Sequence, residues 1–255
     1  MDRPGAPSPG AGKIRLDQLL VDRALVESRQ RARSLIMAGR VCVGGRPIDK
    51  PGTRVPGDSQ VSLQGQDHPF VSRGGVKLAA ALQCVPLGVA DRVCLDVGAS
   101  TGGFTDCLLQ NGARRVYAVD VGYGQLAWKL RQDPRVTVIE RANIRYLPAE
   151  AVGEPVDLAV IDTSFISLRL VVPAVLRFLR PGGRILALIK PQFEVGRGQV
   201  GKGGVVRQAS LHQAVIADLS AFFTDCGLTV EKVLPSPILG PKGNREFIIA
   251  LLFSS

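Results

Sequence analysis

From residue 93 to the end of the chain, short apolar segments alternate regularly with segments of helical periodicity. Seven apolar segments are expected to form strands, at 93–97, 116–119, 136–139, 158–161, 185–189, 229–234 and 247–252. Such alternation favours a doubly wound, mainly parallel α/β sheet. With 255 residues, 45% of them hydrophobic, the chain can bury this sheet and one small additional module.

A glycine-rich turn follows the first expected strand, in the sequence DVGASTGGFTDCLL at 96–109. Glycines allow the backbone to approach a ligand closely, and Asp120, after the second strand, can accept hydrogen bonds from ribose hydroxyls. The gap between Gly98 and Gly102 departs from the Gly-x-Gly-x-x-Gly of dinucleotide sites, which favours a nucleoside-like cofactor without a pyrophosphate. A purely structural turn is the alternative. The expected cofactor contacts are Asp96, Gly98, Ser100, Thr101, Gly102, Gly103, Phe104, Asp120, Val121, Asn143 and Ile144.

A second glycine cluster lies at 196–203 and reads Gly-x-x-x-x-Gly-Lys-Gly. Gly203 replaces the magnesium-binding Ser or Thr of a phosphate loop, and no helical pattern begins there, which argues against nucleoside triphosphate binding. With Arg197, Lys202 and Arg207, this segment is expected to be a mobile basic loop that contacts RNA phosphates. Simple loop flexibility is the alternative.

The segment 13–54 is strongly basic. It holds ten Lys or Arg and four acidic residues, so a net charge of +6 out of the chain's +10 lies there. Leu16, Leu19, Leu20 and Leu25 recur at helical spacing, and a second helix is expected from Ser28, as N-cap, to just before Gly39. Short strands are expected around 41–43, with a turn at 44–45.

This arrangement, with the sequence AGRVCVGGRPIDKPGTRVPGD after the second helix, resembles the S4-like RNA-binding module named for a ribosomal small-subunit protein. A charged face that only contacts solvent is the alternative. The residues expected to bind RNA, here and in the glycine-rich loop, are Lys13, Arg15, Arg29, Arg31, Arg33, Arg40, Arg46, Lys50, Arg197, Lys202 and Arg207.

These patterns predict a domain organisation. A disordered tail at 1–12 precedes a small α+β RNA-binding domain at 13–63, a linker at 64–70 and the α/β domain at 71–255, which opens with a helix capped by Ser72. The chain has neither a signal peptide pattern nor a long apolar run, and its five cysteines lack Cys-x-x-Cys spacing. We therefore expect a soluble, cytoplasmic, monomeric protein with no membrane span, disulfide framework or metal site.

Charged residues follow or precede core strands: Asp162 after the fourth, Lys190 after the fifth and Glu246 before the last. The segment 162–165, Asp-Thr-Ser-Phe, is not the Asn/Asp-Pro-Pro-aromatic motif that amino-group methyltransferases carry at this place. None of the cysteines follows a proline, as the nucleophile of carbon-5 pyrimidine enzymes typically does. If the chain transfers a methyl group, the group that receives it is therefore expected to be neither an amine nor a pyrimidine carbon.

Over nearly its full length the chain resembles the FtsJ-like ribose methyltransferases, and among them the TlyA family. The resemblance is carried by SRGGVKL, DVGASTGGFTDCLL, DTSFISL, IKPQFE, VGKGGVV and GNREF. It implies a Rossmann-like methyltransferase sheet, S-adenosylmethionine as cofactor, and transfer of methyl groups to cytidine 2′-hydroxyls of ribosomal RNA or ribosomal subunits. The family's Lys-Asp-Lys-Glu tetrad falls on Lys77, Asp162, Lys190 and Glu246.

A 2′-hydroxyl must lose its proton as it attacks a methyl group, and a lysine can accept that proton if its surroundings lower its pKa. We expect Lys190 to be the base, Asp162 and Lys77 to orient the hydroxyl, and Glu246 to hold a lysine. The alternatives are solvated surface ion pairs at these positions, an FtsJ-type enzyme acting on another RNA, a pore-forming haemolysin, and a non-catalytic RNA-binding or assembly factor.

Overall fold

The computed structural model describes residues 12–26, 28–37, 39–63, 68–85 and 87–254. The predicted tail therefore lies outside the described residues except for Gly12, as does the part of the predicted linker before residue 68. The chain divides into two compact units, residues 1–67 and 68–255, and each has its own hydrophobic core.

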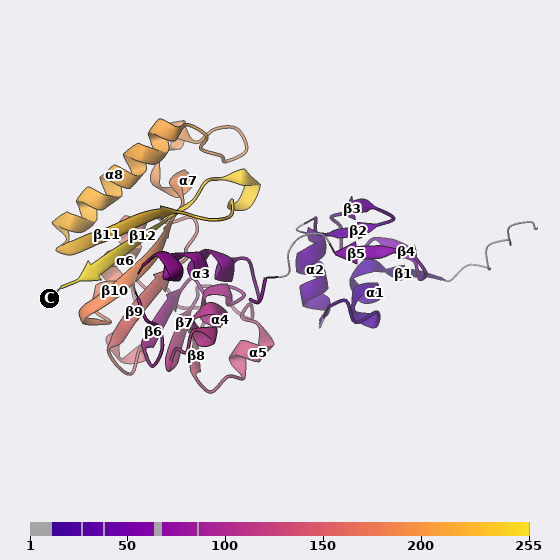
Figure 1. The fold of residues 1–255 in the computed structure, drawn as a ribbon, viewed down its shortest axis with the longest axis horizontal. Coiled ribbons are helices and arrows are strands. Elements are labelled where there is room, and N and C mark those ends of the chain that lie inside the picture. The colour runs from indigo at the N-terminus through magenta and orange to yellow at the C-terminus, as the bar shows by residue number, and fades with distance from the viewer. Residues whose placement is uncertain (1–11, 27, 38, 64–67, 86, 255) are drawn as a thin grey trace, which may run out of the picture. The chain divides into compact units, whose positions relative to one another are not determined.

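The first unit is a small α+β module (Figure 1). Its elements are β1 (Lys13–Arg15), α1 (Leu16–Asp22), α2 (Arg29–Met37), β2 (Val41–Val43), β3 (Arg46–Ile48), β4 (Arg54–Pro56) and β5 (Val61–Leu63). β1 pairs with β4, and the other strands form a sheet in the order β3-β2-β5. Ser28 caps α2 as predicted, because its hydroxyl accepts the Arg31 N–H at 3.2 Å.

Leucines of α1 form the core of this unit with α2. Leu16, Leu19 and Leu20 are almost fully buried against Ile36. The prediction for Leu25 is wrong: α1 ends at Asp22 and Leu25 is 38% exposed. Ala24 adopts a left-handed conformation with φ of 53°, which turns the chain out of the helix before Leu25 can join its apolar face.

The second unit is built on a seven-stranded sheet in the order β11-β12-β10-β9-β6-β7-β8. The strands are β6 (Val93–Val97), β7 (Arg115–Val119), β8 (Val136–Ile139), β9 (Val156–Ile161), β10 (Leu179–Ile189), β11 (Leu228–Pro235) and β12 (Phe247–Phe253). β12 runs antiparallel to both of its neighbours, and the pairs among β10, β9, β6, β7 and β8 are parallel. The predicted doubly wound, mainly parallel sheet is confirmed.

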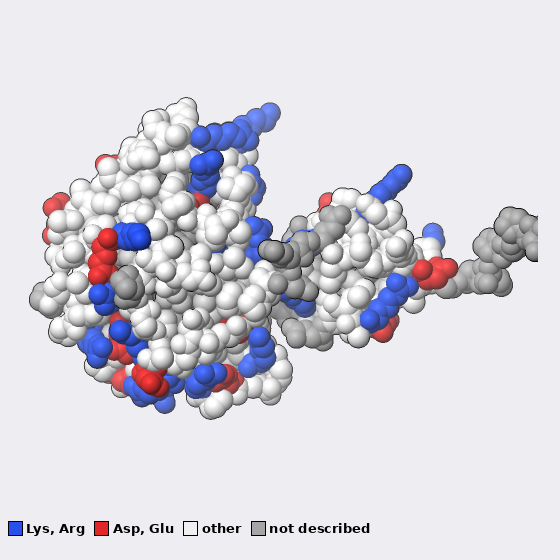
Figure 2. All heavy atoms as spheres, in the orientation of Figure 1, with Lys and Arg blue, Asp and Glu red and all other residues white. Residues whose placement is uncertain are grey.

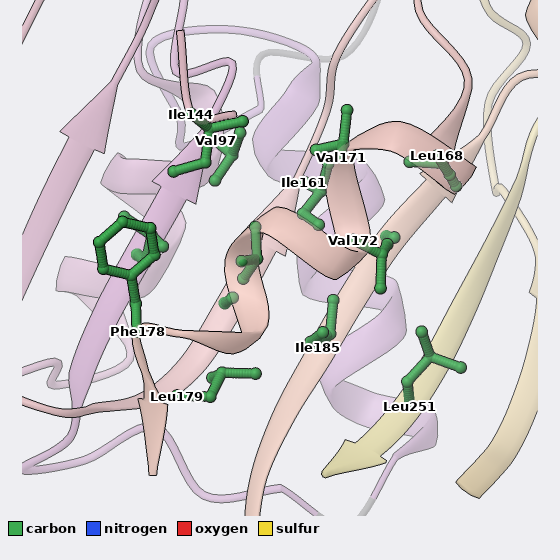
Figure 3. Packing of buried hydrophobic residues seen from close by; sticks show 14 of the residues in the cluster. Val97, Ile144, Ile161, Leu168, Val171, Val172, Phe178, Leu179, Ile185 and Leu251 are labelled. Carbon is green, nitrogen blue, oxygen red and sulfur yellow. The ribbon is translucent and has the colours of Figure 1, made fainter. Parts of the chain in front are cut away.

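Helices cover both faces of this sheet. They are α3 (Gly74–Cys84), α4 (Gly103–Gln110), α5 (Trp128–Arg131), α6 (Leu168–Leu176), α7 (Pro191–Glu194) and α8 (Ala209–Asp225), with short 3₁₀ turns at Ala149–Ala151, Arg197–Gln199 and Pro241–Gly243. Successive strand residues point to opposite faces, so Leu95 packs in the cluster with α6 and α8, whereas Cys94 packs in the cluster with α3 and α4. Figure 3 shows α6 lying on the first cluster, with Val171 and Val172 directed at the strands.

The predicted N-cap of helix α3, Ser72, is wrong by one residue. The helix begins at Gly74, and its N-cap is Arg73, which makes no side-chain capping bond. The carbonyl of Ser72 accepts the Gly75 N–H in a turn, and a Cβ on Gly103 of α4 would overlap Ser72 Oγ. Ser72 therefore packs against the start of another helix. No helix in the described part of the chain is long and apolar enough to cross a membrane.

Candidate active site

The predicted cofactor loop joins β6 to α4. It turns through Gly98 and Gly102, whose φ angles of +85° and +95° lie in the left-handed region that favours glycine. A Cβ on Gly98 would lie 2.6 Å from the carbonyl oxygen of Asp162, and one on Gly102 would overlap the side chain of Leu130. Both positions therefore need glycine, and Gly98 brings the loop against the end of β9.

Asp120 connects this loop to the next one. Its carboxylate accepts the backbone N–H of Ser100 at 2.8 Å and that of Gly122 at 2.6 Å. The loops after β6 and β7 are thus held by one partly exposed carboxylate at the carboxyl edge of the sheet. Each carboxylate oxygen can accept more than one hydrogen bond, so Asp120 can also receive a ribose hydroxyl.

Asp96 is fully buried beneath the loop. Its Oδ2 accepts the Thr105 hydroxyl at 2.6 Å, whereas Oδ1 has no hydrogen-bond partner in the described structure. Burial raises the pKa of Asp96 to about 7. An unsatisfied buried acceptor below a glycine turn fits a site that receives a hydrogen-bond donor from a bound molecule.

Other predicted cofactor residues differ in whether their side chains are accessible to a ligand. Phe104 and Ile144 point their side chains into the two hydrophobic clusters, so they can offer a ligand only backbone groups. Asn143 accepts the Arg145 N–H through Oδ1 at 3.1 Å. Val121, after β7, is 71% exposed and free to cover a bound molecule.

The four predicted catalytic residues form two ion pairs. Lys77 Nζ donates to Glu246 Oε2 at 2.5 Å, and Lys190 Nζ lies 2.6 Å from Asp162 Oδ1. Both lysines and Glu246 are less than 9% exposed, so these are not the solvated surface pairs of the alternative interpretation. Burial at this level is costly for charged groups unless they are paired, and here the pairs supply the compensation.

Sheet topology places the two pairs at the same edge. Asp162 and Lys190 directly follow the adjacent parallel strands β9 and β10. Glu246 directly precedes β12, whose first residue, Phe247, is opposite Ile189, the last residue of β10. The carboxyl edge of such a sheet is where ligands bind in doubly wound folds, and the cofactor loop lies at the same edge.

Three polar residues that were not predicted as site residues form hydrogen bonds that fix side chains and loops at this edge of the sheet. Ser164 accepts a hydrogen bond from Lys190 Nζ at 2.9 Å. Asn244 is buried, accepts the Val206 N–H and donates to the Gly204 carbonyl, which fixes the end of the glycine-rich loop. Glu194 accepts the Ser167 hydroxyl at 2.6 Å and the Leu168 N–H at 2.9 Å. All three residues lie in segments that carry the family resemblance, DTSFISL, GNREF and IKPQFE, and this was the only sequence signal that could have indicated them.

The predicted RNA-binding residues include a paired group. Arg15 and Arg29 both bind the fully buried Asp17, at 2.9 and 3.2 Å, and hydrogen bonds from Arg15 lower the pKa of Asp17 to about 2. Both guanidinium groups stay about half exposed, so donors remain for a phosphate. Basic side chains of the first unit reach the surface on the face drawn in Figure 2.

The remaining predicted RNA-binding residues lie at the surface to different degrees. Those that are exposed are Lys13, Arg33, Arg46, Lys50, Lys202 and Arg207, whereas Arg31 and Arg40 are half-buried. The side chain of Arg197 lies outside the described structure. Among the described residues, no group of three or more His, Cys, Asp or Glu side chains is arranged to hold a metal ion.

Comparisons with known proteins agree with this architecture. The sequence model of the FtsJ-like methyltransferases matches residues 70–253, and that of the S4 domain matches residues 14–61. The fold and the charged sheet edge therefore define an FtsJ-like methyltransferase.

The similarity extends over nearly the whole chain. A relative named 16S/23S rRNA (cytidine-2′-O)-methyltransferase TlyA, from Mycobacterium tuberculosis, is 48% identical over 94% of this chain and 90% of its own. Hemolysin A from Brachyspira hyodysenteriae is 38% identical over 92% of this chain and 98% of its own. A solved structure from Streptococcus thermophilus, described as a candidate hemolysin, has 46% identity and a TM-score of 0.76, covering 96% of this chain and 90% of its own. The chain belongs to the TlyA family of FtsJ-like methyltransferases.

Proposed function

We propose that this protein transfers a methyl group from S-adenosylmethionine to the 2′-hydroxyl of a cytidine ribose in ribosomal RNA. The observation that carries the proposal is the pair of buried Lys–carboxylate contacts at the sheet edge that also holds the glycine loop. The sequence of the rRNA-methylating relative from M. tuberculosis, similar over nearly the full length, supports the substrate class.

The glycine turn and Asp120 would hold the cofactor. Gly98 and Gly102 allow the loop its left-handed turns and its close packing on the protein, Asp120 receives the ribose hydroxyls, and Asp96 supplies a buried acceptor. When bound there, S-adenosylmethionine supplies an electrophilic methyl group on a positively charged sulfur.

Lys190 would remove the proton of the attacking hydroxyl. In its neutral form, Nζ accepts that proton, and Asp162 and Ser164 then hold the resulting ammonium group by the contacts seen in the structure. Lys77 would orient the same hydroxyl, and Glu246 fixes Lys77 from the opposite side. Once Lys190 has taken up the proton, the two ammonium groups and the two carboxylates of the site balance one another in charge.

The first unit would anchor the RNA. We propose the boundaries 13–63 for this RNA-binding domain, 64–70 for the linker and 71–255 for the catalytic domain. The exposed arginines and lysines of the RNA-binding domain suit phosphate contacts, which position an RNA without reading its sequence. We further propose that the protein acts as a monomer on ribosomal RNA in the cytoplasm.

Mapping of 2′-O-methyl groups tests this function. Ribosomal RNA from cells with and without the protein is compared nucleotide by nucleotide, and the purified protein is added back to the unmethylated RNA or subunits with S-adenosylmethionine. We expect at least one cytidine that is methylated only when the protein is present. Identical methylation maps, with no transfer by the purified protein, would refute the proposal.

A further inference from the structure

Glu194 lies at the end of α7, the single helical turn that directly follows Lys190. Both of its carboxylate oxygens are engaged by the start of α6: Oε2 accepts the Ser167 hydroxyl at 2.6 Å and Oε1 accepts the Leu168 N–H at 2.9 Å. Ser167 is the N-cap of α6 and accepts the Arg169 N–H at 3.2 Å. A carboxylate in this place satisfies one of the otherwise unpaired amides of a helix start and is favoured by the helix dipole.

The contacts of Glu194 and of Lys190 hold the two ends of one loop, residues 162–167. The chain between β9 and α6, residues 162–167, belongs to no helix or strand and carries Asp162 and Ser164. At one end of that segment, Lys190 binds both of these side chains; at the other end, Glu194 binds Ser167 and the first amide of α6. Two strand ends, from β9 and β10, are therefore tied together at two points a few residues apart.

The middle of the loop 162–167 is less constrained by polar contacts than its two ends. Phe165 has a positive φ of 64° and is 90% exposed, and its ring centroid lies 5.0 Å from that of Phe193 in α7. A non-glycine residue in this conformation is strained and persists only where its surroundings fix it. Without Glu194, the aromatic contact and the Lys190 contacts alone would have to hold the segment in register.

We propose that Glu194 is a positioning residue for methyl transfer: it fixes residues 162–167 relative to α7, so that Asp162 and Ser164 stay on the Nζ of Lys190. The inference rests on the proposed function, in which Lys190 accepts the proton of the hydroxyl. Glu194 itself is expected to touch neither cofactor nor RNA.

Single-turnover methyl transfer at saturating S-adenosylmethionine and RNA tests the proposal. Glu194→Ala is expected to lower the rate about tenfold, while the Kd for S-adenosylmethionine stays unchanged. Glu194→Gln should recover most of the rate, because its amide can accept from Leu168 and donate to Ser167. The matched control is Glu231→Ala, which removes an exposed carboxylate of β11 that pairs with Arg184 in the middle of β10 and should leave the rate unchanged.

A double-variant cycle separates positioning from general stabilisation. If Glu194 acts through Lys190, adding Glu194→Ala to Lys190→Ala causes no further fall in rate. A full tenfold further fall, or a wild-type rate in Glu194→Ala alone, would overturn the inference. If the Ala variant of Glu194 is too unstable to assay, Ser167→Ala should give a smaller fall of the same kind, because it leaves Glu194 the Leu168 N–H while removing the hydroxyl donor and the cap of Arg169. An unchanged rate in Lys190→Ala would instead reject the proposed base, whatever Glu194 does.

Discussion

Replacing Gly98 by alanine tests whether the cofactor loop and the end of β9 are one rigid unit. An alanine at φ of +85° is strained by about 1–2 kcal/mol. Its Cβ would also lie 2.6 Å from the carbonyl oxygen and 3.0 Å from the carbonyl carbon of Asp162. These backbone atoms cannot move freely, because the Asp162 N–H donates to the Val97 carbonyl at 3.0 Å.

The clash adds an overpacking cost of about 1–3 kcal/mol, so the total loss of unfolding free energy is about 2–5 kcal/mol. Any movement that relieves the clash displaces Asp162 from Lys190, and the methyl-transfer rate should fall as well. Gly227→Ala is the control: Gly227 has nearly the same φ, +81°, but nothing lies within 4 Å of its Cβ position. It should cost only the strain and leave the rate unchanged.

Urea denaturation gives the two free energies, and single-turnover transfer gives the two rates. Equal destabilisation by both variants, with a normal rate for Gly98→Ala, would refute the idea that Gly98 is required by close contact with the end of β9.

Three further perturbations follow from the site. Lys77→Met leaves the buried Glu246 without its cation and should cost about 3–5 kcal/mol of unfolding free energy, most of which the double variant with Glu246→Gln regains; no recovery in urea denaturation would contradict the pairing. Asp120→Ala should weaken S-adenosylmethionine binding by about 1.5–3 kcal/mol, and calorimetry with unchanged affinity in the folded variant would reject its role as a ribose acceptor. Deletion of residues 1–63 should leave cofactor affinity intact but abolish tight, salt-dependent RNA binding; the same affinity and salt slope without them would show that the anchor lies elsewhere.

The strands could be predicted well from the sequence because buried parallel strands read as short apolar runs between glycines, prolines and charges. β6 and β8 match their predicted bounds, whereas β10 begins six residues earlier, at Leu179. The Pro-Gly-Gly after Arg180 hides this start, since it interrupts the apolar pattern while the strand continues through a shift in register.

The proximity of Asp162 and Lys190 could be predicted from the sequence, but not which lysine Glu246 would bind. Lys190 and Asp162 follow neighbouring strands, so their proximity follows from the topology. That Glu246 binds Lys77 could not be derived, because 169 residues separate them and α3 approaches the edge only through tertiary packing. Ser164 and Glu194 were missed for a different reason: serine and glutamate are common at loop and helix ends, and only coordinates reveal which of them contact the site.

Single-turnover methyl transfer by Lys190 variants shows whether this side chain accepts the proton of the attacking hydroxyl. Purified wild type, Lys190→Ala and Lys190→Arg are mixed with saturating S-adenosylmethionine and unmethylated ribosomal RNA over a range of pH. Arginine keeps the positive charge beside Asp162 but cannot give up its proton, so both variants should lose about 10²–10⁴ in rate at the pH where wild type is fastest, while binding cofactor and RNA normally. A near wild-type rate for Lys190→Arg would show that this side chain acts only as a positive charge and would contradict the proposed base.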